Sequence, residues 1–341
     1  MAARTAPNRP TSNLSAAPAK ARKRGGGTAL AFPTWAFLLF FFVMPIGLVL
    51  WYSFGQKPDL FSAHDNSVFS FDRYFEALNE TFLKTFWNTL GIGLTGTLIC
   101  LLIAVPFAYW LAIKAPGWFR PLGLALVLVP FWTNFLVRTL GWQILLAPEG
   151  PVSNWLQQLG LSAVPLDFLY TRGAVQLGVV YNYLPLMILP LFVAIDRAGP
   201  ALREASRDLG ANRWRTLFTI TLPLATPGIA SGALLVFIPL MGDYVTASVL
   251  GGAQGNMVGQ LVANQFNVAQ NWALGSAMAV VLMLFIAAAV LCAGLLAFLA
   301  RALIRRNRRI DLSQLKPSQL KPSQLAGIGP KAGIHQKGGP R

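Results

Sequence analysis

The side chains that most often carry catalysis or metal binding are scarce in this sequence and lie far apart. Only two histidines, His64 and His335, and two cysteines, Cys100 and Cys292, occur in 341 residues. Neither pair indicates a catalytic dyad, a zinc site or a disulfide framework, because each of these needs a defined spacing. The sequence also lacks a GxxxxGK[S/T] phosphate-binding loop. It therefore predicts a protein that is not an enzyme, binds no cofactor or metal, and leaves any use of ATP to another chain.

A few polar and aromatic side chains interrupt otherwise apolar stretches, and these are the candidates for contact with a solute. Arg138 lies four residues from both Asn134 and Trp142, which would place the three on one face of a helix. An arginine in a membrane is costly unless it faces protein or water, so Arg138 is either a pathway residue or a side chain that reaches the outer interface. Asp243, next to Tyr244, is either a cation-attracting group or a helix-end carboxylate that is satisfied locally.

Long apolar runs must carry these residues. The chain is 55% hydrophobic and only 12% charged, whereas soluble domains carry about 25% charged residues. A spanning helix needs about 20 apolar residues, and in lipid its backbone must be hydrogen-bonded internally. The sequence thus predicts an all-α integral membrane protein with a transmembrane domain over residues 30–300. Its six expected transmembrane helices are 30–52, 87–113, 121–147, 174–196, 224–249 and 273–300.

The basic residues predict an orientation for these spans. With both termini inside, the N-terminal tail holds 6 lysines and arginines, the 114–120 loop 2, the 197–223 loop 5 and the C-terminal tail 10, out of 28 in the chain. Since cytoplasmic segments are enriched in lysine and arginine, the expected topology is N-in, C-in. The net charge of +16 is then explained by anionic lipid headgroups, and no nucleic-acid partner is expected.

The two ends of the chain have the composition of segments without a core. Residues 1–29 are rich in Ala, Pro, Ser, Arg and Lys, and residues 301–341 contain the repeat SQLKPSQLKPSQL. Such sequences bury too little apolar surface to fold. We therefore expect a disordered basic cytoplasmic tail at the N-terminus and a basic low-complexity cytoplasmic tail at the C-terminus.

Two further patterns concern packing. Gly228 and Gly232 form a GxxxG pair, which permits close helix contact within this chain or with another chain.

Phe71, Tyr74 and Phe75 recur at helical spacing in the first outer loop, which predicts a short helix at the outer surface.

One cytoplasmic segment, EASRDLGANRWRTLFTITLP from Glu204 to Pro223, is strongly patterned. Residues 202–209 contain no helix breaker and are expected to form a short helix. Gly210 then permits a sharp bend, and Asn212 is expected to cap a second short helix over 212–219. Pro223 is expected to restart the chain before the next span. An amphipathic helix on the lipid surface would explain the arginines of this segment but not the spacing of its other residues.

The segment resembles the EAA signature of type I ABC importer permeases, in which Glu-Ala-Ala, a glycine and Ile-x-Leu-Pro follow at set intervals. A serine stands here in place of the second alanine. The resemblance implies the type I ABC importer permease fold, with the 197–223 loop as a coupling helix that docks on an ATP-binding subunit. The residues that it assigns to ATPase coupling are Glu204, Ala205, Ser206, Gly210, Ile220, Leu222 and Pro223.

The stretches PFWTNFLVRTLGW, VVYNYLPLMILPLFVAI and LLVFIPLMGDYVTASVLGG resemble spermidine/putrescine permeases. This resemblance covers about residues 30–300 and implies polyamine import across a bacterial cytoplasmic (inner) membrane. The implied partners are ABC ATPase subunits that bind the ATP, a second homologous permease chain, an extracytoplasmic solute-binding protein and membrane lipid. Carboxylates and aromatic faces suit polyamine cations. The expected translocation-path residues are Trp132, Arg138, Tyr181, Tyr183, Asp243 and Tyr244.

Alternatives differ in substrate or in mechanism. Related permeases that import opines, iron or amino-acid-like solutes share parts of these patterns. An ion-coupled secondary transporter would be expected to show inverted repeats and intramembrane acids, of which this sequence has few. A membrane enzyme would need a clustered nucleophile, base or metal set, and a passive channel would not need the spacing of the coupling segment.

Overall fold

The computed structural model describes residues 26–59, 64–67, 69–161 and 168–307. Residues 1–25 and 308–341, which make up most of the two predicted tails, lie outside the described residues. Within the described ranges the regular structure is helical, apart from one isolated antiparallel bridge between Gln56 and Asp65. The predicted all-α membrane fold is confirmed.

Five continuous helical runs are long and apolar enough to cross a membrane, and they overlap five of the predicted spans. In lipid a helix satisfies its own backbone hydrogen bonds, so apolar stretches of this length fold as helices. The runs are α1 (Gly26–Leu38) with η1 (Leu39–Val43) and α2 (Met44–Tyr52), α4 (Glu80–Tyr109) with η2 (Trp110–Lys114), α8 (Arg172–Arg197), α10 (Arg213–Thr216) with η4 (Leu217–Thr221) and α11 (Leu222–Met241), and α13 (Trp272–Asn307).

The stretch predicted as one span over 121–147 is instead a bent pair of helical segments. Helix α5 (Phe119–Leu128) and the 3-10 turn η3 (Val129–Trp132) lead to α6 (Phe135–Leu146) and α7 (Pro151–Gln158), and the two halves meet at 88°. Thr133 is extended with ψ 148°, and Asn134 restarts the helix as its N-cap by accepting a 2.8 Å hydrogen bond from the backbone N–H of Leu136. Asn134 is therefore the N-cap of the helix that carries Arg138 and Trp142, and its side chain is turned toward the backbone of that helix.

The fifth span also ends earlier than its predicted limit at residue 249. Helix α11 stops at Met241, two residues after Pro239, and Gly242 follows as its C-cap. A turn then leads to the π-helical η5 (Ala247–Gly251) and to α12 (Val258–Asn267). This early stop places Asp243 in a turn and not within a span.

Helix α8 is the centre of the bundle. It packs against α4 and against α11, and half of its most apolar window is buried, a larger share than in any other run. Gly228 and Gly232 of α11 face Pro190 and Met187 of α8. The GxxxG pair therefore makes a contact within this chain, as one of its two interpretations predicted.

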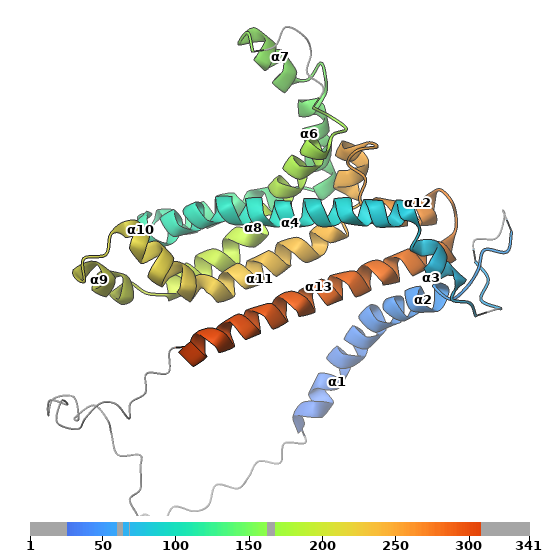
Figure 1. The fold of residues 1–341 in the computed structure, drawn as a ribbon, viewed down its shortest axis with the longest axis horizontal. Helices are drawn as coiled ribbons and strands as arrows, with labels where there is room; N and C mark the ends of the chain where they lie inside the picture. The colour runs from blue at the N-terminus through green and yellow to red at the C-terminus, as the bar shows by residue number, and fades with distance from the viewer. Residues whose placement is uncertain (1–25, 60–63, 68, 162–167, 308–341) are drawn as a thin grey trace, which may run out of the picture.

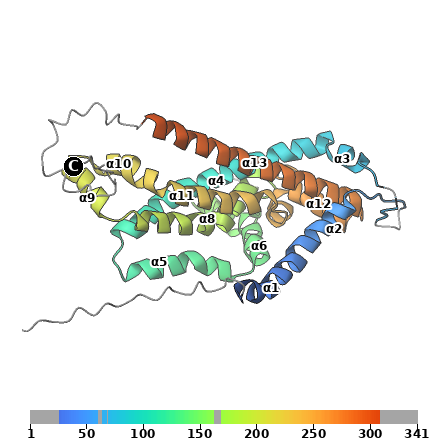
Figure 2. The same cartoon turned by 90° about the horizontal axis from the view of Figure 1, so that it is seen from below.

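The helical runs extend between two ends of the molecule, and each end carries its own set of short helices and loops. Helices α9 (Ala201–Asp208) and α10 lie at one end, and α3 (Asp72–Ala77) and α12 lie at the other (Figures 1 and 2). Arg120 Nη1 lies 3.6 Å from Asp196 Oδ1, which joins the start of α5 to the end of α8 on the α9 side. All the loops that the charge pattern placed in the cytoplasm thus reach one end of the molecule.

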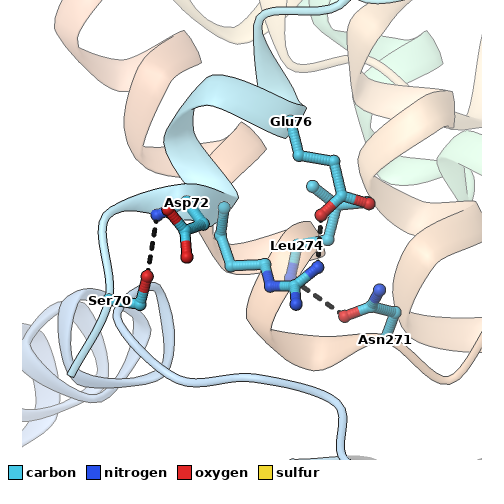
Figure 3. A network of polar contacts seen from close by, with 6 residues as sticks. Ser70, Asp72, Glu76, Asn271 and Leu274 are labelled. Carbon is cyan, nitrogen blue, oxygen red and sulfur yellow. Dashed lines mark hydrogen bonds and ion pairs between the residues drawn. The ribbon is translucent and has the colours of Figure 1, made fainter. Parts of the chain in front are cut away.

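Three local polar contacts lie near one another at the opposite end (Figure 3). The backbone N–H of Asp72 donates to Ser70 Oγ at 3.0 Å, Arg73 pairs with Glu76 on α3, and Asn271 Oδ1 caps α13 by accepting from the N–H of Leu274 at 3.1 Å. Helix α3 packs against α13. The predicted short helix in the first outer loop is confirmed.

Gly228→Ala tests the α8–α11 contact. The added methyl group would lie 2.7 Å from the carbonyl oxygen of Pro190 and in collision with Ala194 Cβ. We expect it to destabilise the detergent-solubilised protein by about 1–3 kcal/mol, as overpacking does, measured as a lower Tm. Gly47→Ala in α2 is the control, since nothing lies within 4 Å of the added carbon. Equal Tm values for the two variants would contradict the role of Gly228.

Candidate functional site

The segment assigned to coupling folds as a helix with a glycine C-terminus. Helix α9 ends at Asp208 with Leu209 as its C-cap, and Gly210 follows with φ +81°. The N–H of Gly210 donates to Arg207 O at 2.8 Å and that of Ala211 donates to Ser206 O at 3.1 Å, the two bonds of a Schellman motif. A Cβ at Gly210 would meet no atom within 4 Å. Backbone conformation, and not space, is therefore the reason for glycine here.

Asn212 starts the next helix, as predicted. Its side chain accepts a 2.8 Å hydrogen bond from the N–H of Arg215, and it adopts an extended backbone, as N-cap residues do. The Oγ atoms of Ser206 and Thr216 lie 3.1 Å apart and join α9 to α10. Ser206, the position that departs from the EAA pattern, thus makes a hydrogen bond that an alanine could not make.

The second predicted short helix is in fact the first part of a longer one. Helicity is continuous from Arg213 to Met241, so the expectation that Pro223 restarts the chain is wrong. The π-helical η4 immediately precedes α11, where Pro223 is in the first turn. A proline lacks the N–H for the i−4 bond and its ring crowds that carbonyl. The wider turn of η4 accommodates this, because a π-helix pairs residues five apart.

Most of this coupling element is open to the surface. Glu204, Ala205, Gly210 and Pro223 are exposed, whereas Ile220 and Leu222 are half-buried. The side chain of Leu209, at the tip between the two helices, is 89% exposed. The tip of this element is therefore open to contact from outside the chain.

Three of the six expected path residues come together where α6, α8 and the turn after α11 meet. Asp243 is 6% exposed and accepts hydrogen bonds from the N–H of Thr246 at 3.0 Å and from its Oγ1 at 2.6 Å. The Tyr183 hydroxyl faces the Asp243 carboxylate closely enough to interact with it. The Arg138 guanidinium lies over the Phe131 and Phe135 rings, at 5.3 and 5.5 Å from their centroids.

The other three path candidates lie apart from this group. Trp132 is 86% exposed on η3, and Tyr244 is also exposed although it follows Asp243 in sequence. Tyr181 packs edge-on against Trp142 at 5.4 Å, in a groove of about 490 Å³ on the face of α8. The six residues therefore do not form one site.

Two neighbours of the group were missed by reasoning from charge and aromatic content. Thr139 is fully buried, and Asn182 donates its Nδ2 to Thr139 Oγ1 at 3.4 Å. The available signal was that Asn182 is one of only two amide side chains in the uncharged run 173–195, the other being Gln176. Among the described residues, no group of three or more His, Cys, Asp or Glu could hold a metal ion.

Comparison with known proteins agrees with this architecture. Residues 104–310 match the family described as binding-protein-dependent transport system inner membrane component. The chain is 38% identical over 282 residues to the spermidine/putrescine transport system permease protein PotB of Haemophilus influenzae, covering 81% of this chain and 94% of that protein. It is 36% identical over 245 residues to PotB of Escherichia coli K12, covering 72% and 88%.

A solved structure shares the fold. A bacterial ABC transporter involved in the import of the acidic polysaccharide alginate contains a chain that superposes with a TM-score of 0.63 at 18% identity, covering 79% of this chain and 93% of that one. The helical runs, the coupling element and the sequence match point the same way. This multi-pass inner membrane protein belongs to the family of inner membrane components of binding-protein-dependent transport systems, the permeases of ABC importers.

Proposed function

We propose that this chain imports a polyamine, spermidine or putrescine, as one permease subunit of an ABC importer whose ATP is bound by separate subunits. The observation that carries the proposal is the α9–Gly210–α10 element, an exposed and locally rigid tip joined directly to a spanning helix. The names of the two PotB relatives support the substrate class, because the match to them covers most of both chains.

The geometry suggests how a movement of the ATPase subunits would be transmitted to the membrane-spanning helices. Force on α9 passes through the Schellman bonds and the Ser206–Thr216 hydrogen bond into α10. From there the helix runs to Met241 without interruption. Rigid elements transmit a rigid-body displacement, whereas a flexible loop would absorb it.

We assign the α9 end of the bundle to the cytoplasm, with both termini inside. Lys114, Arg120 and Arg197 lie near that end, in addition to the arginines of α9 and α10. The opposite end carries the acid-rich outer loops, where two hydrogen bonds from Ser67 hold the pKa of the Asp65 carboxyl below its usual value. An extracytoplasmic binding protein would dock on this end, where acidic groups favour a cationic solute.

A second permease chain would cover surface that this chain leaves open. The run Phe32–Tyr52 has none of its apolar window buried. A groove of about 530 Å³ also opens between α8 and α11, with Pro190 and Gly228 in its wall. Apolar faces of this extent suit a helical partner in the membrane, with lipid over the remainder. The solute would pass between the two permeases, near Arg138, Tyr183 and Asp243.

The proposal is tested by reconstituting the chain with candidate partners from the same organism: a second permease, an ABC ATPase and a solute-binding protein. We expect uptake of labelled putrescine or spermidine into vesicles that depends on ATP and persists when ion gradients are collapsed. Uptake that follows an ion gradient without ATP would contradict the importer mechanism. ATP-dependent uptake of a different solute, with none of either polyamine, would contradict the substrate alone.

Gly210→Ala should uncouple the permease from its ATPase. A side chain at φ +81° is strained by about 1–2 kcal/mol, which disfavours the Schellman turn and reorients α9. We expect at least a tenfold loss of substrate-stimulated ATP hydrolysis with normal membrane insertion. Gly210→Asn should retain most activity, because asparagine tolerates this conformation. Gly117→Ala, on the same end and with nothing within 4 Å, is the matched control.

Thiol labelling tests the orientation. In a Cys292→Ser background the remaining Cys100 is buried. Leu209→Cys should then react with a membrane-impermeant maleimide only in inside-out vesicles, and Phe75→Cys, at a position that is 77% exposed on α3, only in right-side-out ones. The reverse pattern would invert the assignment.

A further inference from the structure

The group around Asp243 contains hydrogen-bonding atoms that the described part of the chain does not satisfy. Asn182 Oδ1, and Nε and Nη1 of Arg138, are buried and have no hydrogen-bond partner among the described residues. Burying a polar atom without a hydrogen-bond partner destabilises a protein, and more so when the group is charged. We call Arg138, Thr139, Asn182, Tyr183 and Asp243 the polar node.

Hydrogen bonding determines which amide atom of Asn182 is unpaired. The Thr139 hydroxyl donates its one proton to the carbonyl oxygen of Phe135 at 3.0 Å. The Thr139 oxygen can therefore only accept a hydrogen bond from Asn182. The amide must then point its NH₂ group at Thr139 Oγ1, and Nδ2 lies 3.4 Å from that oxygen. The oxygen of Asn182 is consequently the unpaired atom, in a side chain that is 1% exposed.

The node contains one positive group, Arg138, and one negative group, Asp243, and the two do not form an ion pair. Arg138 forms no ion pair within 4 Å among the described residues. Tyr183 lies within electrostatic reach of both the Arg138 guanidinium and the Asp243 carboxylate. The node thus combines one cation with three oxygen acceptors, namely Asn182 Oδ1 and Tyr183 Oη on α8 and the Asp243 carboxylate in the turn after α11.

We propose that the polar node is a binding site for a primary ammonium group. When no solute is present, the positive charge of Arg138 balances the negative charge of the Asp243 carboxylate. An ammonium group has three N–H donors and no acceptor, which matches the three acceptors of the node. Its arrival would displace the Arg138 guanidinium from the field of Asp243. The inference rests on the proposed import of an amine and extends it by naming the atoms that receive one of its charged ends.

Helix α6 provides a means for Arg138 to leave. It joins η3 at the 88° bend, where Thr133 and Asn134 are both extended, and such a junction can act as a hinge. Beyond the node α6 continues into α7, which projects away from the bundle (Figure 1). A small rotation at this hinge that keeps Thr139 beside Asn182 would still swing the longer Arg138 side chain away from Asp243, because Arg138 and Thr139 lie about 100° apart around α6.

Direct binding tests the proposal. The probe is radiolabelled putrescine, added to the purified complex of both permeases and the ATPase in nanodiscs, without the binding protein. Arg138→Gln removes the competing charge, so we expect about a tenfold lower Kd than in the unaltered complex. Asn182→Leu and Asp243→Asn should each weaken binding by about tenfold or more. Arg120→Gln, which removes an exposed arginine at the other end, should leave Kd unchanged.

Thr139 separates a binding role from a structural one. Thr139→Ser keeps the hydroxyl group that orients the Asn182 amide and should retain binding, whereas Thr139→Val should weaken it. Equal Kd values for these two variants, or an Arg138→Gln complex that binds putrescine no more tightly than the unaltered one, would overturn the ammonium site. Failure of every complex to bind putrescine would also overturn it. ATP hydrolysis stimulated by the loaded binding protein would then show that the permease function itself stands.

Discussion

The structure depends on one close contact, that of α8 with α11. Pro190 and Gly228 meet there at a distance that only a glycine permits on the α11 side. In a membrane, lipid competes equally well for apolar surface, so helices associate through close packing and through small residues more than through the hydrophobic effect. With α4 on its other face, α8 becomes the fixed part of the molecule. The coupling element and the polar node are both placed relative to it.

The fold and the coupling element follow largely from properties that are local in the chain. Span length and charge define five of the helical runs, and Gly210 was predicted correctly because a left-handed turn after a helix calls for glycine. Asn212 was likewise identifiable as a cap from its residue type and place. Backbone preference and the hydrophobic period act over a few residues, and a sequence displays both.

The predictions of backbone structure are wrong, or a contact is missed, where a side-chain hydrogen bond or a distant segment decides which conformation the chain adopts. Residues 121–147 are as apolar as a straight span, and the break occurs because Asn134 bonds to the backbone of the next helix. Pro223 was interpreted as a restart because a regular α-helix would exclude it, yet the preceding π-turn makes room. The Asn182–Thr139 bond joins residues 43 positions apart, and no local pattern encodes such a contact.

The uninterrupted helix from Arg213 to Met241 has a mechanical consequence. Its 29 residues, at about 1.5 Å each, make a rod of about 43 Å. If the contact with α8 serves as the fulcrum near its middle, a tilt of about 5° would move each end by about 2 Å, in opposite directions. Asp243 stands two residues beyond the far end of this rod. An inward push on the proposed ATPase side would therefore become an outward displacement at the Asp243 carboxylate. The helix would work as a lever between the proposed ATPase contact and the proposed solute site.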